Sequence, residues 1–544
     1  MRTDQADRLQ SLLVEARLAH EAGDVEKMSK VLDNAFSAGI EDPVLLRTAA
    51  EVMRSEGRIV DAGQLLNRAL TIAPDDAETI AQIGRLFVDE GRTSEAIDAF
   101  RAALRIQPGL VAAWNSLAAA FAGERKFDAA SAAFQRVSLL SPGDPDPLAA
   151  LSLVEVRRGR LDSARKLASQ ALTLHSAHPL ALLTLARVEV DDQNFASAKA
   201  KLELLLAAQS LNPSQRQTAW RLLGDALDGL GLIDEAFNAY GQVKRAFAAQ
   251  HARRFGPGGA VENHVAFIDR LRTWFERQDM SGWSAVSSPV DSPVRQHVFL
   301  LGYLRSGVTL VESILASLSG TRVLEEADTL RVADSIFLRN DESLARLNPL
   351  DPVAAQHARD AYWKRVREKI SDVDGKLFVD MSPLYGIKLP MIARLFPNAI
   401  CVVCRRDPRD VVLSCFRRNF KVNALTYQLT SLESIARHYD AAQSLTERHL
   451  QVLPMPRHFV EYSRLVRDFD GTTKALAEFI GADWTERVRE FNSTAASLPI
   501  ATPSAMQVRK ALFDGGDQWR RYCRQIESVL PTLRPWVEKF GYLD

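Results

Sequence analysis

Two short segments of the chain combine arginine with hydroxyl side chains in a way that suits the binding of phosphate groups. The first follows an apolar run at residues 297–301 and precedes apolar residues at helical spacing, which predicts a strand, a glycine-containing loop and a helix. Backbone N–H groups of such a loop and the start of its helix point toward one place and favour a bound anion. The candidate ligands in this loop are Arg305, Ser306, Gly307, Val308 and Thr309.

The glycines of this loop have the spacing of the phosphate loop G-x-x-x-x-G-K-[ST], with Val308 in place of the lysine. Nucleotide hydrolases use that lysine on the β- and γ-phosphates, so we do not expect ATP hydrolysis. A nucleotide kinase would share the expected fold, but it also uses this lysine, so it is only a minor alternative. A tight turn from strand to helix that binds no ligand would also explain the glycines.

The second segment lies between an apolar run at 399–404 and an apolar helical pattern at 411–416. Arg406 and Ser414 are eight residues apart in it, and an arginine fork with one hydroxyl suits a phosphate dianion. A solvated basic rim is one interpretation of Arg405, Arg409, Arg417 and Arg418, and contact with the ligand is the alternative for Arg405 and Arg409. Cys401 and Cys404 do not predict a metal site, because residues i and i+3 of a strand point to opposite faces.

Both segments resemble signatures of the sulfotransferases. The loop resembles P-R-S-G-T-T-L-x-E, with Leu304 in place of proline and Val308 in place of the first threonine, and the second segment resembles C-R-R-D-P-R-D-V-x-L-S-C-[YF]. The chain looks most like bacterial sulfotransferases linked to tetratricopeptide repeats, whose catalytic domain is similar to tyrosylprotein sulfotransferases. The resemblance implies that the loop binds the 5′-phosphosulfate of 3′-phosphoadenosine 5′-phosphosulfate (PAPS). It implies that Arg406 and Ser414 bind the 3′-phosphate.

The resemblance also implies a catalytic glutamate 21 residues after the loop arginine. Counting from Arg305 gives Glu326 as the general base, with Glu325 as the alternative. A lysine is expected in the family's D-K-x-P segment, and Met381 occupies that position here. Other lysines that could supply the cation are Lys388, Lys421 and Lys510.

Late in the chain, Arg509 lies in a Q-V-R segment and Trp519 with Arg520 in a W-R-x-Y segment, as in the resembled family. We expect these residues to contact the nucleotide. An anchoring role in the core is an equal alternative for Trp519.

The elements that must carry this chemistry follow a repeat array. Pro74, Pro108 and Pro142 are 34 residues apart, and alanines and Gly-Arg pairs keep the same period. The pattern resembles tetratricopeptide repeats and predicts helix hairpins over residues 5–247. The array either captures a peptide or protein on its concave face or serves as a rigid spacer or dimerisation arm.

Composition sets the remaining limits. With 68 Lys+Arg and 68 Asp+Glu, the formal net charge is zero, which argues against binding of a nucleic acid polymer. Four cysteines in 544 residues form no disulfide framework, and no apolar stretch is long enough to span a membrane. The N-terminus does not resemble a signal peptide, so we expect a cytoplasmic protein.

The sequence therefore predicts an α-helical repeat solenoid at 5–247, a junction at 248–295, and a P-loop-like α/β domain with a parallel sheet at 296–544. We expect a PAPS-dependent sulfotransferase that needs no metal and modifies an acceptor hydroxyl, with protein tyrosine as one possibility. The alternative is a catalytically degenerate scaffold in which the repeats bind a partner, because Met381 and Val308 depart from the family pattern.

Overall fold

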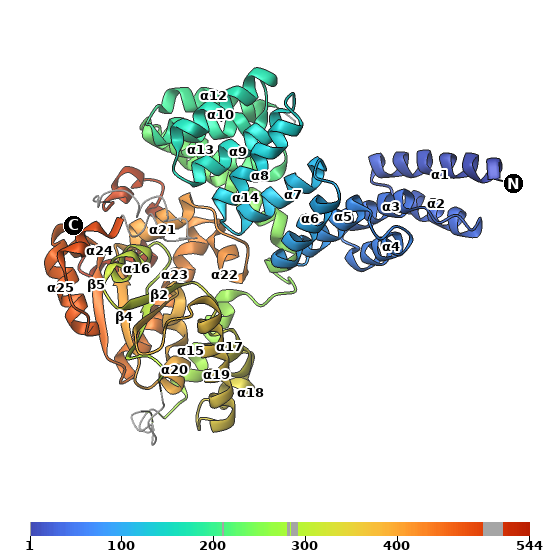
Figure 1. Ribbon diagram of the computed structural model, residues 1–544. Coiled ribbons are helices and arrows are strands. Elements are labelled where there is room, and N and C mark those ends of the chain that lie inside the picture. The colour runs from blue at the N-terminus through green and yellow to red at the C-terminus, as the bar shows by residue number, and fades with distance from the viewer. Residues whose placement is uncertain (1, 209–210, 280–282, 284–291, 493–514, 544) are drawn as a thin grey trace. The chain divides into compact units, whose positions relative to one another are not determined.

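A computed structural model describes residues 2–208, 211–279, 283, 292–492 and 515–543 of the chain. It divides the chain into two compact units, Met1–Leu222 and Leu223–Asp544. The first unit is helical, and the second contains the strands (Figure 1). The boundary between the units lies before residue 247, where the sequence predicts the end of the repeats. The end of the predicted repeat array, residues 223–247, therefore belongs to the second unit.

The first unit consists of helices paired as hairpins. They are α1 (Arg2–Ala22), α2 (Val25–Ser37), α3 (Pro43–Ser55), α4 (Ile59–Ile72), α5 (Ala77–Asp89), α6 (Thr93–Ile106), α7 (Val111–Gly123), α8 (Phe127–Leu140), α9 (Pro145–Arg157), α10 (Leu161–Leu174), α11 (Pro179–Asp191) and α12 (Phe195–Ala207). The next helix, α13 (Pro213–Gly229), spans the division between the units. The predicted helical repeats are confirmed.

The periodic residues account for the hairpins. Gly57, Gly91 and Gly159 have φ values of 77°, 77° and 78° at the turns, where glycine adopts this backbone without strain. Arg125 fills the same place in one hairpin with φ 60°. The five periodic alanines are 0% exposed, because the second helix of each hairpin packs closely on the first; they are Ala62, Ala96, Ala130, Ala164 and Ala198.

The second unit contains a five-stranded parallel sheet in the order β2-β3-β1-β4-β5. The strands are β1 (Gln296–Leu301), β2 (Thr321–Glu325), β3 (Leu377–Met381), β4 (Ile400–Arg405) and β5 (Arg457–Glu461). The predicted parallel α/β domain is confirmed. Successive connections lead to β3 on one side of β1 and to β4 on the other, so the strand order reverses between β1 and β4. Ligands of open parallel sheets bind at the carboxyl ends of the strands at such a point.

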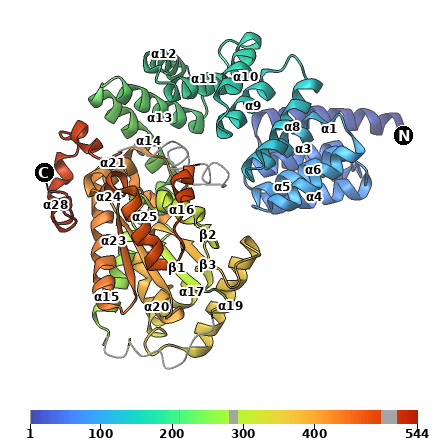
Figure 2. The same ribbon diagram turned by 60° about the vertical axis from the view of Figure 1, so that its left-hand side comes forward.

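Helices cover both faces of this sheet (Figure 2). One face packs Val298 and Leu300 against α16 (Val308–Ser317) and α25 (Phe469–Ile480). On the other face, the ring of Phe299 lies 5.7 Å from that of Phe396 and 5.5 Å from that of Tyr385.

The remaining helical segments of the second unit are α14 (Ile233–Phe255), α15 (His264–Glu276), α17 (Arg331–Phe337), α18 (Asp341–Ala345), α19 (Pro352–Lys369), η1 (Pro383–Lys388), α20 (Leu389–Leu395), α21 (Pro408–Arg417), α22 (Ala424–Tyr427), η2 (Gln428–Thr430), α23 (Leu432–Val452), α24 (Tyr462–Arg467), η3 (Glu486–Glu490), η4 (Gln518–Tyr522), η5 (Glu527–Val529) and α28 (Leu530–Lys539). Within the described ranges, no helix combines the length and apolar character needed to cross a membrane.

Candidate functional site

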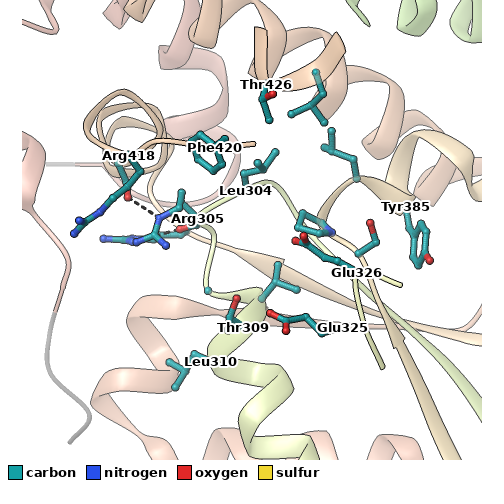
Figure 3. Close-up of a pocket in the computed structure, with 18 of the residues that line it drawn as sticks. Leu304, Arg305, Thr309, Leu310, Glu325, Glu326, Tyr385, Arg418, Phe420 and Thr426 are labelled. Atoms are coloured by element: carbon teal, nitrogen blue, oxygen red, sulfur yellow. Dashed lines mark hydrogen bonds between the residues drawn. The ribbon is translucent and has the colours of Figure 1, made fainter. Parts of the chain in front are cut away.

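A cleft of about 880 Å³ lies in the second unit at the carboxyl ends of β1, β2, β3 and β4. The turns after β1 and β4 line it together, as the strand order predicts. Arg305 and Arg418 are grouped in one part of the cleft, and Glu325 and Glu326 in another (Figure 3). The cleft therefore has a cationic part and an acidic part.

The turn after β1 owes its shape to its glycines. A Cβ on Gly302 would lie 2.8 Å from the carbonyl oxygen of Cys404 and 2.5 Å from Oγ of Ser306, so only glycine fits. Gly307 has φ 99° and precedes α16 without a side-chain cap. The start of α16 lines the cleft, and the N-terminus of a helix favours a bound anion.

Three of the predicted loop residues have different roles. Ser306 is buried, and its Oγ accepts a hydrogen bond from the backbone N–H of Tyr303 at 3.2 Å, which closes the turn. Thr309 is also largely buried but lines the cleft. Val308 lines the cleft with part of its surface and packs into the core below it.

The two predicted phosphate-binding segments meet at Arg305. Its Nε donates to Oγ of Ser414 on α21 at 2.9 Å, and its carbonyl oxygen accepts from Nη1 of Arg406 at 3.3 Å. The guanidinium of Arg406 lies over the ring of Tyr462 at 4.7 Å. Its Nε is buried without a hydrogen-bond partner among the described residues. Arg305, Arg406 and Ser414 therefore lie together although more than 100 residues separate the two segments.

In the cationic part, Arg305 is buried close to two other positive charges. Burial lowers the pKa of Arg305, and the guanidinium groups of Arg418 and Arg406 lower it further. Removing a cation from water and placing it beside like charges costs free energy, which a bound anion offsets. The donor set of guanidinium groups, a hydroxyl and helix N–H groups fits phosphate or sulfate esters.

The acidic part contains the predicted base. Glu326 follows β2 with φ 40°, and its backbone N–H donates to the carbonyl oxygen of Met381 at 2.9 Å. Its side chain is exposed to the cleft, yet desolvation by the cleft walls raises its pKa, and the charge of Glu325 raises it further. Lys421 opposes this rise. Below them, burial raises the pKa of Glu312 to about 9, with Glu325 and Glu326 adding to it.

The predicted replacements for the missing lysine have different surroundings. Met381 is 0% exposed and belongs to the apolar core of the sheet. Lys388 lines the cleft, but its Nζ forms an ion pair with Oδ2 of Asp334 at 2.6 Å. Lys421 lines the cleft and acts on Glu326. Lys510 lies outside the described residues.

Trp519 and Arg520 of the late segment are not among the residues that line the cleft. Arg509 lies outside the described residues. Trp519 is buried, and the guanidinium of Arg409 lies 3.8 Å from its ring centroid, which is the surrounding of a core anchor. Arg520 is exposed and pairs with Asp517 at 3.2 Å. The cleft is lined instead by neighbours of these residues, Gly515 and Gln518.

Two cleft residues were not predicted as ligands. Arg417 and Arg418 line the cleft one turn after Ser414, whereas their sequence position had suggested only a basic rim. The spacing i, i+3 on α21 would have identified Arg417, because such residues share a helix face, whereas Arg418 follows the helix with an extended backbone. By contrast, Arg405 is held away by an ion pair with Glu447 at 2.6 Å. No cluster able to hold a metal ion occurs within the ranges that the structure describes.

Comparisons with known proteins match the first and the last parts of the chain to different families. Residues 297–486 match the model of the sulfotransferase family, and residues 53–121, 87–154, 149–213 and 183–251 match tetratricopeptide-repeat models. An uncharacterized protein of Aquifex aeolicus (strain VF5) is 26% identical over 255 residues, which are 45% of this chain and 33% of that protein. This chain thus spans about a third of the length of its curated relative.

Two of the solved structures found are those of pilF of Pseudomonas aeruginosa and a tetratricopeptide repeat protein of Parabacteroides merdae. They have TM-scores of 0.34 and 0.36 and are 18% and 13% identical. The matches cover 37% and 44% of this chain and 90% and 93% of those chains. The family models give this chain tetratricopeptide repeats joined to a domain of the sulfotransferase family.

Proposed function

We propose that the second unit is a PAPS-dependent sulfotransferase that moves a sulfuryl group to an acceptor hydroxyl. The observation that carries the proposal is the hydrogen bond between Arg305 and Ser414, since it joins two separate anion-binding turns at one edge of the sheet. A nucleotide with phosphate groups at both its 3′ and 5′ positions requires two such sites close together. Arg305, Gly307 and Thr309 would hold the 5′-phosphosulfate, and Arg406 with Ser414 the 3′-phosphate.

Glu326 is the proposed general base. As the acceptor oxygen attacks sulfur, a new S–O bond forms and the bond from sulfur to the bridging phosphate oxygen breaks. Glu326 takes the hydroxyl proton, and its raised pKa brings its basicity closer to that needed near neutral pH. Arg305 and the N–H groups of α16 stabilise the negative charge that develops on the leaving phosphate.

Lys421 is our candidate for the cation that Met381 does not supply. It lines the same cleft as Glu326 and acts on that carboxylate electrostatically, whereas Lys388 is already paired with Asp334. A cation here would offset charge on the transferring sulfonate.

The cleft also has apolar lining residues, among them Leu304, Phe420 and Leu425. These side chains are compatible with an acceptor that carries its hydroxyl on an apolar or aromatic group, and protein tyrosine is one such acceptor. We further propose that the repeats recruit the substrate or a partner protein, as repeat arrays with extended concave surfaces do.

One specific observation favours a second candidate function. Met381 is completely buried in the apolar core, so the position where the family's lysine is expected offers no cation to the cleft. The domain would then bind a nucleotide without transferring sulfate, and the repeats would act as a scaffold. Binding of PAP, the nucleotide that remains after sulfuryl transfer, without turnover of PAPS would identify such a scaffold.

The test uses labelled PAPS and a panel of phenolic and sugar acceptors. Glu326→Gln should lower turnover by at least about 100-fold while PAP, the desulfated product nucleotide, binds as before, because the amide keeps the shape but accepts no proton. Glu325→Gln is the matched control, and it should keep most of the activity. Loss of PAP binding in Glu326→Gln, or full turnover by it, would exclude Glu326 as the base.

A further inference from the structure

We infer that Lys244 and Asp228, from the last two helices of the repeat-matched region, are positioning residues for the nucleotide cleft. Both belong to the second unit, where they hold the end of α21. The last helix hairpin of the array is therefore part of the scaffold of the site. The consequence for nucleotide binding rests on the proposed function.

Lys244 caps the carboxyl end of α21. Its Nζ donates to the carbonyl oxygens of Cys415 at 3.0 Å and Arg418 at 2.8 Å. The last carbonyl groups of a helix have no partners within the helix and carry its partial negative charge, so an amine is well placed there. Lys244 is 5% exposed, and burial lowers its pKa to about 7. A lysine buried at this cost has a definite task in the fold.

Asp228 near the end of α13 anchors the side chains of the same region. Its Oδ2 pairs with Arg417 at 2.6 Å, and its Oδ1 accepts from the hydroxyl of Tyr522 at 2.8 Å. The backbone carbonyl of Asp228 also accepts from Arg521. Asp228 thus joins α21 to η4, whose first residue, Gln518, lines the cleft.

One face of α14 packs along α21 and its neighbours. Phe237 stacks on Phe416 with ring centroids 4.7 Å apart, Lys244 follows two turns later, and the carbonyl of Ala248 accepts from Tyr427 at 3.4 Å. These positions repeat at helical spacing and so share one face. α14 has 23 residues, whereas the second helix of the preceding hairpin, α12, has 13. The extra length extends this face to the contact of Ala248.

The end of α21 determines where the cleft wall runs. Ser414, Arg417 and Arg418 line the cleft from this helix and its cap, and the chain continues along the cleft through Phe420 and Lys421. The cap residue Arg418 has extended backbone angles, φ −113° and ψ 149°, so the chain leaves the helix there. Without Lys244, two carbonyl groups lose their donor at the point that sets this direction.

The experiment compares Lys244→Met and Asp228→Asn with Val366→Ala in the full chain. Val366 is buried on α19, which contributes no residue to the cleft among those described, so its truncation lowers the thermal midpoint without touching α21. PAP affinity is measured by calorimetry well below each midpoint. Hydrogen exchange is followed for peptides covering residues 411–421.

Lys244→Met should weaken PAP binding at least tenfold and raise exchange in 411–421 at least tenfold, and Asp228→Asn should do the same to a smaller degree. Val366→Ala should match the wild type in both measurements. Wild-type affinity and exchange in Lys244→Met would overturn the inference, as would equal effects in Val366→Ala. If the wild type binds no PAP, the proposed function fails, and exchange in 411–421 alone decides the role of Lys244.

Discussion

The turns after β1 and β4 end at the same edge of the sheet but hold their arginines by different means. The first depends on backbone shape: Arg305 and Gly307 have φ values of 69° and 99°. The second depends on side chains. Oδ1 of Asp407 accepts from the backbone N–H of Arg409 at 2.9 Å, and the carboxylate of Asp407 also binds the guanidinium of Arg409. The first turn should therefore be sensitive to added atoms, and the second to lost charges.

The largest effect should come from Arg305→Ala. This variant removes a buried cation that contributes to both turns, so PAP affinity should fall about 1,000-fold, equivalent to about 4 kcal/mol. Arg405→Ala is the matched control, because Arg405 ends β4 but is paired with Glu447 and lies over Phe459. Calorimetric titration distinguishes the two variants. Equal losses would show that general positive charge, and not the geometry of the first turn, binds the nucleotide.

The helices that follow the two turns differ in their buried carboxyl groups. The pKa of Glu312 on α16 is raised by burial to about 9, so the folded protein keeps this group protonated where the unfolded chain ionises. The contribution of Glu312 to stability should then be lost as pH rises from about 4.5 to 9. Glu312→Gln should match the wild type near pH 4.5 and be more stable by about 3 kcal/mol at pH 7 in urea unfolding.

Asp410 on α21 is the comparison, because burial raises its pKa only to about 6, with Arg406 opposing the rise. The gain in stability of Asp410→Asn over the wild type should therefore increase with pH only up to about pH 6. Parallel stability curves of Glu312→Gln and the wild type would contradict the assignment of a protonated Glu312.

Gly302→Ala tests the dependence of the first turn on backbone shape. The added Cβ would lie 2.8 Å from the backbone oxygen of Cys404, which cannot move without shifting β4. Overpacking of this kind costs about 2 kcal/mol. Thermal unfolding should show the loss, together with weaker PAP binding. Gly123→Ala, where the added Cβ meets no atom within 4 Å, should show neither, and an unchanged Gly302→Ala would refute the steric argument.

The smallest effect should come from Ser414→Ala. Ser414 accepts one hydrogen bond from Arg305 and would offer its own O–H to the 3′-phosphate. Loss of such contacts costs about 1 kcal/mol, or about fivefold in affinity. Calorimetry resolves this difference, and a loss as large as that of Arg305→Ala would show that Ser414 positions the arginine and does more than contact the ligand.

The sequence predicted those parts of the fold that local patterns determine. The repeat hairpins follow from glycine and alanine at a fixed period, and β1 and β4 follow from apolar runs that end at charged residues. The meeting of Arg305 with Arg406 was predicted only through the resemblance. The sheet order that produces it depends on long-range pairing, which no local pattern encodes.

The contacts of individual side chains were harder to predict than the helices and strands. Trp519 follows a ligand-like motif but is buried beside Arg409, and Arg520 is directed to Asp517. No sequence pattern marks Lys244 as a residue that positions the cleft, because its partners are backbone carbonyls 171 and 174 residues away. Only the assembled structure brings such groups together.

The most direct test of the account is a titration of the wild type and Arg406→Ala with PAP and with 5′-AMP, which lacks the 3′-phosphate. A second anion site formed by Arg406 predicts that the wild type binds PAP at least about 100-fold more tightly than AMP. Arg406→Ala should keep at most the roughly fivefold preference for PAP that the hydroxyl of Ser414 supplies. Equal affinity of the wild type for PAP and AMP, or a preference of about 100-fold that survives in Arg406→Ala, would contradict the assignment of two joined phosphate sites.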